Sequence, residues 1–215
     1  MTKATLSLLI GLAGSLACVT AVSAQEITGV SIHYVSSEWY TMPAENIING
    51  NGLDTSVEPA CHSNAPVDSY YWETQPWLGT AVIAFDLGDV YDLGAIHVWN
   101  FNYVNQNGSY TGRGAKDVDI LTSLDGSEWI SHGVHVFDIA TGTADYTGQR
   151  ISFETPLRGT RYVKFDIMSY YGGGDSAGHV GLSEVRFLEA VPEPGSIAML
   201  LMGASALIVR GRRRR

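Results

Sequence analysis

The stretch AFDLGDVYDLGAIHVWNFN, residues 84–102, decides the fold class of this chain. It contains two runs rich in aliphatic, aromatic and β-branched residues, which favour strands, and Gly88 lies between them. The first run predicts a strand over residues 80–87 that ends at Gly88. The second predicts a strand over residues 93–103 that is apolar on both faces.

Most of the remaining sequence alternates between apolar and polar residues with a period of two, and turn residues separate the segments. One helical turn is expected over residues 44–48, after Pro43. A tight turn is expected at Asp125-Gly126. Further strands are expected over residues 27–35, 115–124, 128–137, 150–154, 160–170 and 180–189. Eight strands predict an all-β fold, an eight-stranded antiparallel jelly-roll sandwich.

The alternation also predicts which side chains face the core. Val30, Ile32 and Tyr34 are expected on one side of the first strand. In the fourth strand, Val118 and Ile120 are expected to point inward.

The last 25 residues form a segment of their own. A Val-Pro-Glu-Pro sequence begins at residue 191, an apolar run covers residues 195–209, and an Arg-rich cluster covers residues 210–215. This order resembles the PEP-CTERM sorting tail of Gram-negative bacteria, which implies export and processing by an exosortase-type membrane enzyme. A helix over the apolar run would be roughly 22 Å long. Because the hydrocarbon core is about 30 Å thick, the run suits a transient anchor in the inner membrane, with the Arg cluster on the cytoplasmic side. An ordinary tail anchor is the alternative.

The N-terminal segment is expected to be a secretory signal peptide. Lys3 precedes an apolar stretch over residues 6–22, and small residues up to Ala24 offer a cleavage site for signal peptidase before Gln25. The predicted organisation is therefore a signal peptide (1–24), one β-sandwich domain (25–190) and a sorting tail (191–215). The predicted location is the cell surface or the extracellular matrix.

The domain itself is strongly acidic. Residues 25–191 hold 21 acidic and seven basic residues, a formal charge of −14. This charge argues against a nucleic-acid or anionic-lipid partner. Cys61 is the only cysteine that remains after removal of the signal peptide, so no intrachain disulfide is expected and a passive thiol is favoured over a catalytic one.

Five blocks of sequence carry a family resemblance. In this order they are similar to a discoidin domain, also called the coagulation-factor C-type or galactose-binding-like domain. The resemblance implies a jelly roll, often with a structural Ca²⁺, whose loops at one end bind sugars or other surface ligands. Such domains are mostly non-enzymatic. The blocks are AENIINGNGLD (44–54), the opening stretch (84–102), KDVDILTSLDGSEW (116–129), TRYVKFDI (160–167) and GLSEVRFLE (181–189).

The resemblance implies a calcium site. Residues 46–54 are dense in side-chain oxygens and glycines, which suits an ion with six to eight oxygen ligands. Asn49 takes the position of the family's first Asp, Asn51 follows it, and Asp54 takes a position often held by Thr. Glu184 matches the family's Glu on the last strand. The alternative is a polar turn capped by its own Asn side chains.

Sugar binding needs aromatic faces and planar polar groups, and three loops supply both. These loops are residues 36–76, 105–114 and 169–178. The candidates for ligand contact are Trp77, Asn102, Arg113, Tyr170, Tyr171 and His179. Structural alternatives stay open: Trp72 and Trp99 are expected in the core, Asn100 fits a buried amide, and Arg113 could pair with Asp117 or Asp119.

No familiar catalytic motif is present. The sequence lacks a Gly-x-Ser-x-Gly elbow, a His-Glu-x-x-His motif and a phosphate-binding loop. His132 and His135 are expected on opposite faces of a strand, which argues against a zinc site. The main hypothesis is an exported, non-catalytic binding module for exopolysaccharide or another glycan. The alternatives are a structural or adhesive matrix protein without a pocket and, less favoured, a small glycan hydrolase that uses Asp117 and Asp119.

Overall fold

The computed structural model describes residues 24–172 and 178–191. Residues 1–23 of the predicted signal peptide (1–24), the predicted C-terminal hydrophobic helix and the Arg cluster lie outside the described residues. Within them, no helix is both long and apolar enough to cross a bilayer.

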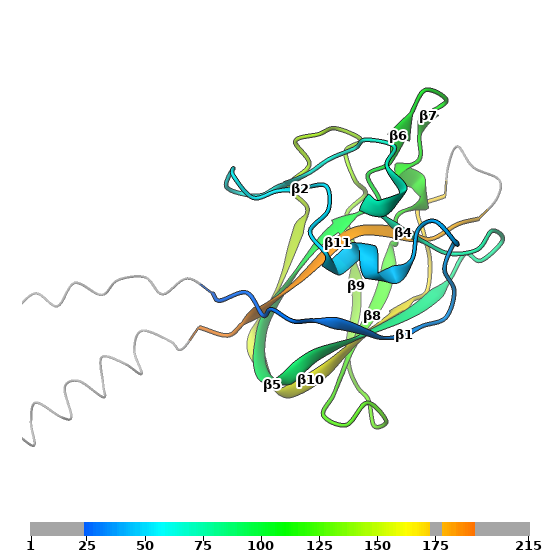
Figure 1. The fold of residues 1–215 in the computed structure, drawn as a ribbon. Coiled ribbons are helices and arrows are strands. Elements are labelled where there is room, and N and C mark those ends of the chain that lie inside the picture. Colours follow the sequence, from blue (N-terminus) through cyan, green and yellow to red (C-terminus); the bar gives the residue numbers. More distant parts are fainter. Residues whose placement is uncertain (1–23, 173–177, 192–215) are drawn as a thin grey trace, which may run out of the picture. The chain divides into compact units, whose positions relative to one another are not determined.

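Strands dominate the described part of the chain (Figure 1). One seven-stranded antiparallel sheet contains β1 (Ser31–Val35), β4 (Trp72–Glu73), β5 (Ala81–Asn100), β8 (Asp117–Ser123), β9 (Ile130–Val136), β10 (Gln149–Ile167) and β11 (Gly181–Glu189). Two small hairpins pair β2 (Leu53–Asp54) with β3 (Cys61–His62) and β6 (Val104–Asn105) with β7 (Gly108–Ser109). Three short 3₁₀ helices are η1 (Ala44–Ile48), η2 (Asp68–Tyr70) and η3 (Thr111–Arg113).

The two long strands, β5 and β10, build both layers of the sandwich. Residues 81–86 of β5 pair with residues 162–167 of β10, and residues 95–98 of β5 pair with residues 149–152. Between these regions the register shifts and both strands curve, so each strand passes from one layer into the other (Figure 1). The sequence predicted two separate strands in each case. Here the backbone bends at Gly88, whose φ is 86°, without ending the strand.

The first layer contains β1, the first half of β5, the second half of β10, β8 and β9. The second contains β4, β11, the second half of β5 and the first half of β10. This arrangement confirms the predicted all-β antiparallel sandwich. The 3₁₀ helix η1 also forms over the predicted residues.

Aromatic rings join the two layers. Phe85 lies 5.3 Å from Phe165 within the first layer and 5.1 Å from Phe187 in the second, measured between ring centroids. All three side chains are fully buried, and each burial stabilises the fold by about 2–3 kcal/mol. Val118 and Ile120 are buried as predicted.

A β-bulge in β1 changes the predicted face of Tyr34. Ile32 pairs with Phe85, whereas Tyr34 pairs with Ala84, so His33 is an extra residue without a partner on β5. The extra residue reverses the alternation. The prediction for Tyr34 is therefore wrong: its side chain is 53% exposed, and Val35 packs against the core in its place.

A second irregularity, in β9, changes the predicted faces of two histidines. Asp119 pairs with Val134 and Leu121 pairs with Ser131, so β9 carries one residue more than β8. Gly133, with a φ of 91°, lies in this extra stretch. The rings of His132 and His135 both lie near the ring of Phe153, at 6.4 and 6.2 Å. The prediction that they occupy opposite faces is therefore wrong.

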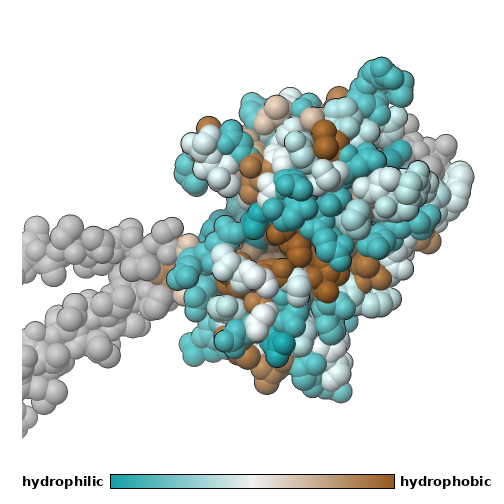
Figure 2. Space-filling view, in the orientation of Figure 1, coloured by the Kyte–Doolittle hydropathy of each residue, from teal (hydrophilic) through white to brown (hydrophobic). Residues whose placement is uncertain are grey.

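The face of the domain in Figure 2 is mainly polar, and apolar residues form separate patches between the polar ones. This agrees with the excess of acidic residues. Exposed large apolar side chains include Ile130, Val134 and Val136, which all belong to β9, a strand at the edge of the sheet.

Candidate functional site

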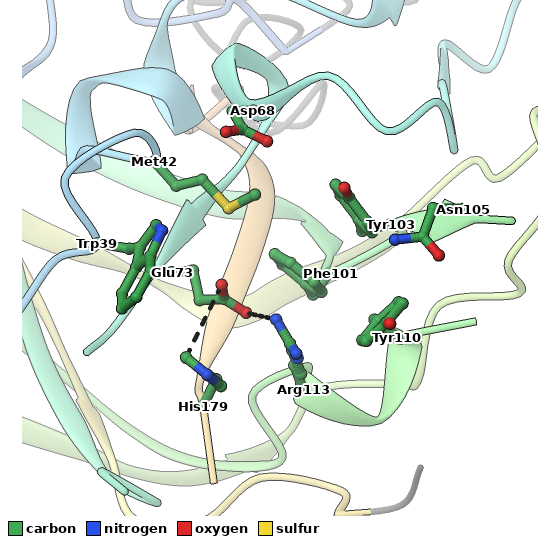
Figure 3. Close-up of a pocket in the computed structure, with 10 residues that line it drawn as sticks. All are labelled: Trp39, Met42, Asp68, Glu73, Phe101, Tyr103, Asn105, Tyr110, Arg113 and His179. Carbon is green, nitrogen blue, oxygen red and sulfur yellow. Dashed lines mark hydrogen bonds and ion pairs between the residues drawn. The ribbon is translucent and has the colours of Figure 1, made fainter. Parts of the chain in front are cut away.

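A cavity of about 290 Å³ opens beside β4 and η3. Its walls come from segments that are distant in sequence: the loop after β1, η2, β4, the segment after β5, η3 and the segment before β11 (Figure 3). The lining residues include Trp39, Asp68, Glu73, Tyr103, Tyr110, Arg113 and His179, and we call this the Glu73–Arg113 cavity.

A buried carboxylate forms its base. Glu73 is only 3% exposed and accepts a 2.6 Å hydrogen bond from Arg113 Nη1. β4 holds Glu73 at the sheet edge, where it pairs with Gly181 of β11. A buried carboxylate is costly unless it is paired. The pair therefore holds the guanidinium in one position at the wall of the cavity.

His179 adds a third polar group. Its Nδ1 lies 3.0 Å from the carbonyl oxygen of Thr74 and 3.8 Å from Glu73 Oε2. A carbonyl oxygen only accepts, so the Nδ1–H of His179 donates to Thr74. The base of the cavity thus combines a guanidinium, a carboxylate and an imidazole.

Aromatic rings form two walls of the cavity. The guanidinium of Arg113 lies 4.5 Å from the centroid of the Tyr110 ring, and Tyr103 packs at 5.7 Å against Tyr110. On the other side, Trp39 meets His179 edge-on at 6.0 Å. Figure 3 shows Trp39 and the two tyrosines on opposite sides of the Glu73–Arg113 pair. The backbone N–H of Trp39 donates to the Glu73 carbonyl at 2.6 Å, which holds this loop against β4.

The structure brings two of the six predicted ligand residues, Arg113 and His179, into this cavity. Arg113 pairs with Glu73, whereas the sequence alternatives were Asp117 and Asp119. The sequence reasoning missed Glu73, Trp39 and the tyrosines. A glutamate next to Trp72 in an apolar segment was the available signal, because a buried carboxylate requires a cationic partner.

Asn102 has a structural role. Its side chain is fully buried, its Nδ2 donates to the carbonyls of His62 (3.1 Å) and Thr143 (2.9 Å), and its Oδ1 accepts from Gly142 N–H at 2.9 Å. These bonds commit both ends of the amide to the protein. The prediction that Asn102 reaches a ligand is therefore wrong. Asn100 is a buried amide, as expected.

The remaining predicted ligand residues do not line this cavity. Tyr171 donates its hydroxyl to the Phe137 carbonyl at 2.6 Å, and Tyr170 packs against the core. Trp77 is 74% exposed and has a φ of 67°, which is unusual for any residue with a side chain. Ligand contact by Trp77, Tyr170 and Tyr171 stays a prediction.

The predicted calcium ligands show a different arrangement. Glu184 is fully buried and accepts a 3.3 Å hydrogen bond from Gly50 N–H, so the loop and the last strand do meet. Arg186 Nη2, however, lies 2.8 Å from Glu184 Oε1. Burial raises the pKa of Glu184 to about 8, and the nearby Arg186 charge opposes this shift.

The other three predicted calcium ligands are Asn49, Asn51 and Asp54. Two of them use a side-chain oxygen in a local hydrogen bond, and Asn51 is exposed. Asn49 Oδ1 accepts from Asn51 N–H at 2.7 Å, and Asp54 Oδ1 accepts from Ser56 N–H at 2.9 Å. Among the described residues, no group of three or more His, Cys, Asp or Glu side chains is placed to hold a metal. As arranged, the side-chain oxygens of the four predicted ligands do not fit a calcium ion, because the Arg186 guanidinium already lies beside the Glu184 carboxylate. Calcium binding stays a prediction, and it requires Arg186 to move.

Comparisons with known proteins agree with this fold. Among solved structures, the third family 32 CBM (carbohydrate-binding module) of a Clostridium perfringens family 31 glycoside hydrolase has a TM-score of 0.55 and 16% identity, covering 78% of this chain and 95% of that one. The family 32 CBM of C. perfringens NanJ, solved with galactose, has a TM-score of 0.53 and 14% identity, covering 78% and 100%. An F5/8 type C domain from Bacteroides fragilis has a TM-score of 0.54 and 17% identity, covering 79% and 97%.

No curated protein matches the sequence. Two family models do. The PEP-CTERM protein-sorting motif matches residues 190–215, and the F5/8 type C domain matches residues 26–182. The second match spans most of the chain and coincides with the sandwich described above, so this chain belongs to the F5/8 type C (discoidin) domain family and ends in a PEP-CTERM sorting motif.

Proposed function

We propose that this protein is an exported, surface-sorted, non-catalytic module that binds a carbohydrate in the Glu73–Arg113 cavity. The observation that carries the proposal is the Arg113 guanidinium, fixed by a buried carboxylate between aromatic walls. A guanidinium donates hydrogen bonds to oxygen acceptors such as sugar hydroxyls, and aromatic rings pack against the apolar C–H face of a sugar. The cavity thus offers both kinds of contact that a pyranose requires.

The surroundings of the cavity support a sugar over a charged ligand. Arg113 is already neutralised by Glu73, and the Asp68 carboxylate on the rim can accept from a hydroxyl. An anionic ligand would meet the Asp68 carboxylate inside this cavity, whereas a neutral sugar meets donors and acceptors without a charge penalty. The sorting motif supports a location at the surface of a Gram-negative cell, where exosortase-type processing and an extracellular glycan are the expected partners.

Two alternatives receive less support. A matrix protein without a ligand pocket predicts a flat loop end, whereas this end contains a concave cavity. The hydrolase alternative needs Asp117 and Asp119 to face one cleft. Asp117 bonds to Ser169, Asp119 bonds to Ser131, and neither aspartate lines the Glu73–Arg113 cavity.

A glycan array followed by isothermal titration calorimetry tests the proposal. Trp39→Ala removes one aromatic wall without leaving a buried charge, and it should lower the affinity for the best neutral glycan about tenfold or more. The control is Val136→Ala, which truncates an exposed apolar side chain outside the cavity and should leave that affinity unchanged. No glycan binding by a folded protein, or equal loss in both variants, would refute a sugar site in the Glu73–Arg113 cavity.

A further inference from the structure

We propose a second ligand site, for a carboxylate-bearing sugar, on the outer face of the first layer. A groove of about 350 Å³ lies there, lined by His33, Tyr34, Trp129 and Lys164 above a floor of Val82 and Ala84 from β5. We call it the lysine groove. It shares no lining residue with the Glu73–Arg113 cavity.

The β-bulge in β1 gives the lysine groove its exposed ring. Unbroken alternation along β1 from Ile32 would place Tyr34 in the core, and the bulge at His33 turns Tyr34 to the outer face instead. With it, His33 and Tyr34 both line the groove, and Tyr34 remains 53% exposed. Bulges commonly re-aim side chains beside functional sites. An exposed tyrosine ring supplies an apolar face and a hydroxyl to a ligand.

The turn between β8 and β9 closes one end of the groove. Gly126 has a φ of 78°, and a Cβ added there would lie 3.2 Å from His33 Nε2 and 3.5 Å from the Tyr162 ring. Glycine therefore permits both the backbone conformation and the close approach to β1. Asp125 Oδ1 accepts from Glu128 N–H at 3.0 Å, which stabilises the turn that leads to Trp129.

Lys164 supplies the charge that selects a ligand. Its Nζ lies 4.3 Å from the centroid of the Trp129 ring, so the ammonium is held at the wall of the groove. In the part of the chain that the structure describes, no carboxylate lies within ion-pair distance of this ammonium. Three arginines differ in this respect, because Arg113 pairs with Glu73, Arg161 with Asp86, and Arg186 with Glu184.

These features together fit an acidic sugar. The carboxylate of a uronic acid would accept a charge-assisted hydrogen bond from Lys164, while the C–H face of its ring packs on Tyr34. His33 offers a further polar group on the same wall. A neutral sugar would gain only the contact with the ring, so the groove should discriminate by charge.

With a second site, one copy of the protein can bind two ligands. In Figure 1 the β6–β7 hairpin, near the first cavity, and the β8–β9 turn, near the lysine groove, lie at opposite ends of the domain. Two sites near opposite ends of the domain can hold two polysaccharide chains at once, and weak sites gain strength when both are engaged.

Calorimetry on the full-length protein tests the inference with one matched pair of probes, methyl β-glucuronoside and its methyl ester. The acid should bind with about millimolar affinity, and the uncharged ester at least tenfold more weakly. Lys164→Gln and Tyr34→Ala should each weaken binding of the acid about tenfold. Arg158→Gln, which removes an exposed cation outside the groove, should leave it unchanged.

Specific outcomes overturn the inference. They are equal binding of acid and ester, no binding of the acid, or binding that Lys164→Gln leaves intact. Tyr34→Ala changes an exposed residue, so its thermal unfolding midpoint should match that of the unchanged protein and separate lost binding from lost folding. Trp39→Ala should not affect the acid, and failure of this site is therefore distinguishable from failure of the neutral-sugar site.

Discussion

Arg113 and Glu73 are 40 residues apart in sequence, yet their side chains meet at 2.6 Å. Arg113 comes from a 3₁₀ turn and Glu73 from a two-residue strand, so neither element fixes the pair by itself. The sheet holds the carboxylate, the carboxylate holds the guanidinium, and the guanidinium covers the Tyr110 ring. A ligand therefore meets donors that are already in place, which lowers the entropy lost on binding.

Glu73→Gln should destabilise the fold and weaken sugar binding. The change leaves Arg113 beside a neutral amide in a largely buried position, and breaking such a pair costs about 3 kcal/mol. Urea unfolding followed by tryptophan fluorescence measures the loss. The double variant Glu73→Gln/Arg113→Gln removes both charges and should recover part of the stability without recovering binding. Equal stability of the single variant and the unchanged protein would contradict a structural role for the pair.

Asn102→Ala should lower the stability of the fold, whereas Trp77→Ala should not. Asn102 satisfies buried backbone groups, so its removal should lower the free energy of unfolding by about 2 kcal/mol. Trp77 is exposed, so Trp77→Ala should leave stability almost unchanged. If Trp77 contacts a glycan, its loss should lower affinity on the array. Stability lost in the Trp77 variant and retained in the Asn102 variant would reverse these assignments.

Arg186→Gln should raise the affinity for calcium. In the structure the guanidinium lies 2.8 Å from the Glu184 carboxylate, where it competes with any cation. Removing its charge should strengthen calcium binding about tenfold, because each 1.4 kcal/mol corresponds to a factor of ten. Titration of both proteins with CaCl₂ by calorimetry measures the difference. If neither protein gives a binding signal, the predicted calcium site is absent.

The stability of the domain should depend on pH through Glu184. Burial raises the pKa of this carboxyl to about 8 in the folded chain, from an ordinary value of 4.5. Between these values the folded state retains a proton that the unfolded state has lost, so the free energy of unfolding should fall as the pH rises from about 4.5 to about 8.

Glu184→Gln removes this titration and should flatten that slope. Urea unfolding at pH 5 and pH 8 checks the change, and Glu128→Gln, at an exposed position, is the matched control. The same slope in the Glu184 variant and in the unchanged protein would show that another group carries the pH dependence.

The amino-acid sequence by itself determined the β class, most strand positions and the family. These features follow from local chemistry: the alternation near Val118, the turn at Gly126 and the residue types in the five blocks are properties of neighbouring residues. The sequence also identified Arg113 and His179 as polar residues of a loop-rich end, because such residue types in loops favour binding.

Only the tertiary structure decided which side chains pair with each other and which face of a strand each side chain occupies. The pairing of Arg113 with Glu73 depends on which strand lies at the sheet edge, and no local pattern encodes a contact over 40 residues. The exposure of Tyr34 depends on one bulge, because a single extra residue reverses every side chain that follows it on a strand. Asn102 looks in sequence like a ligand residue, but the backbone groups packed around it make it part of the scaffold.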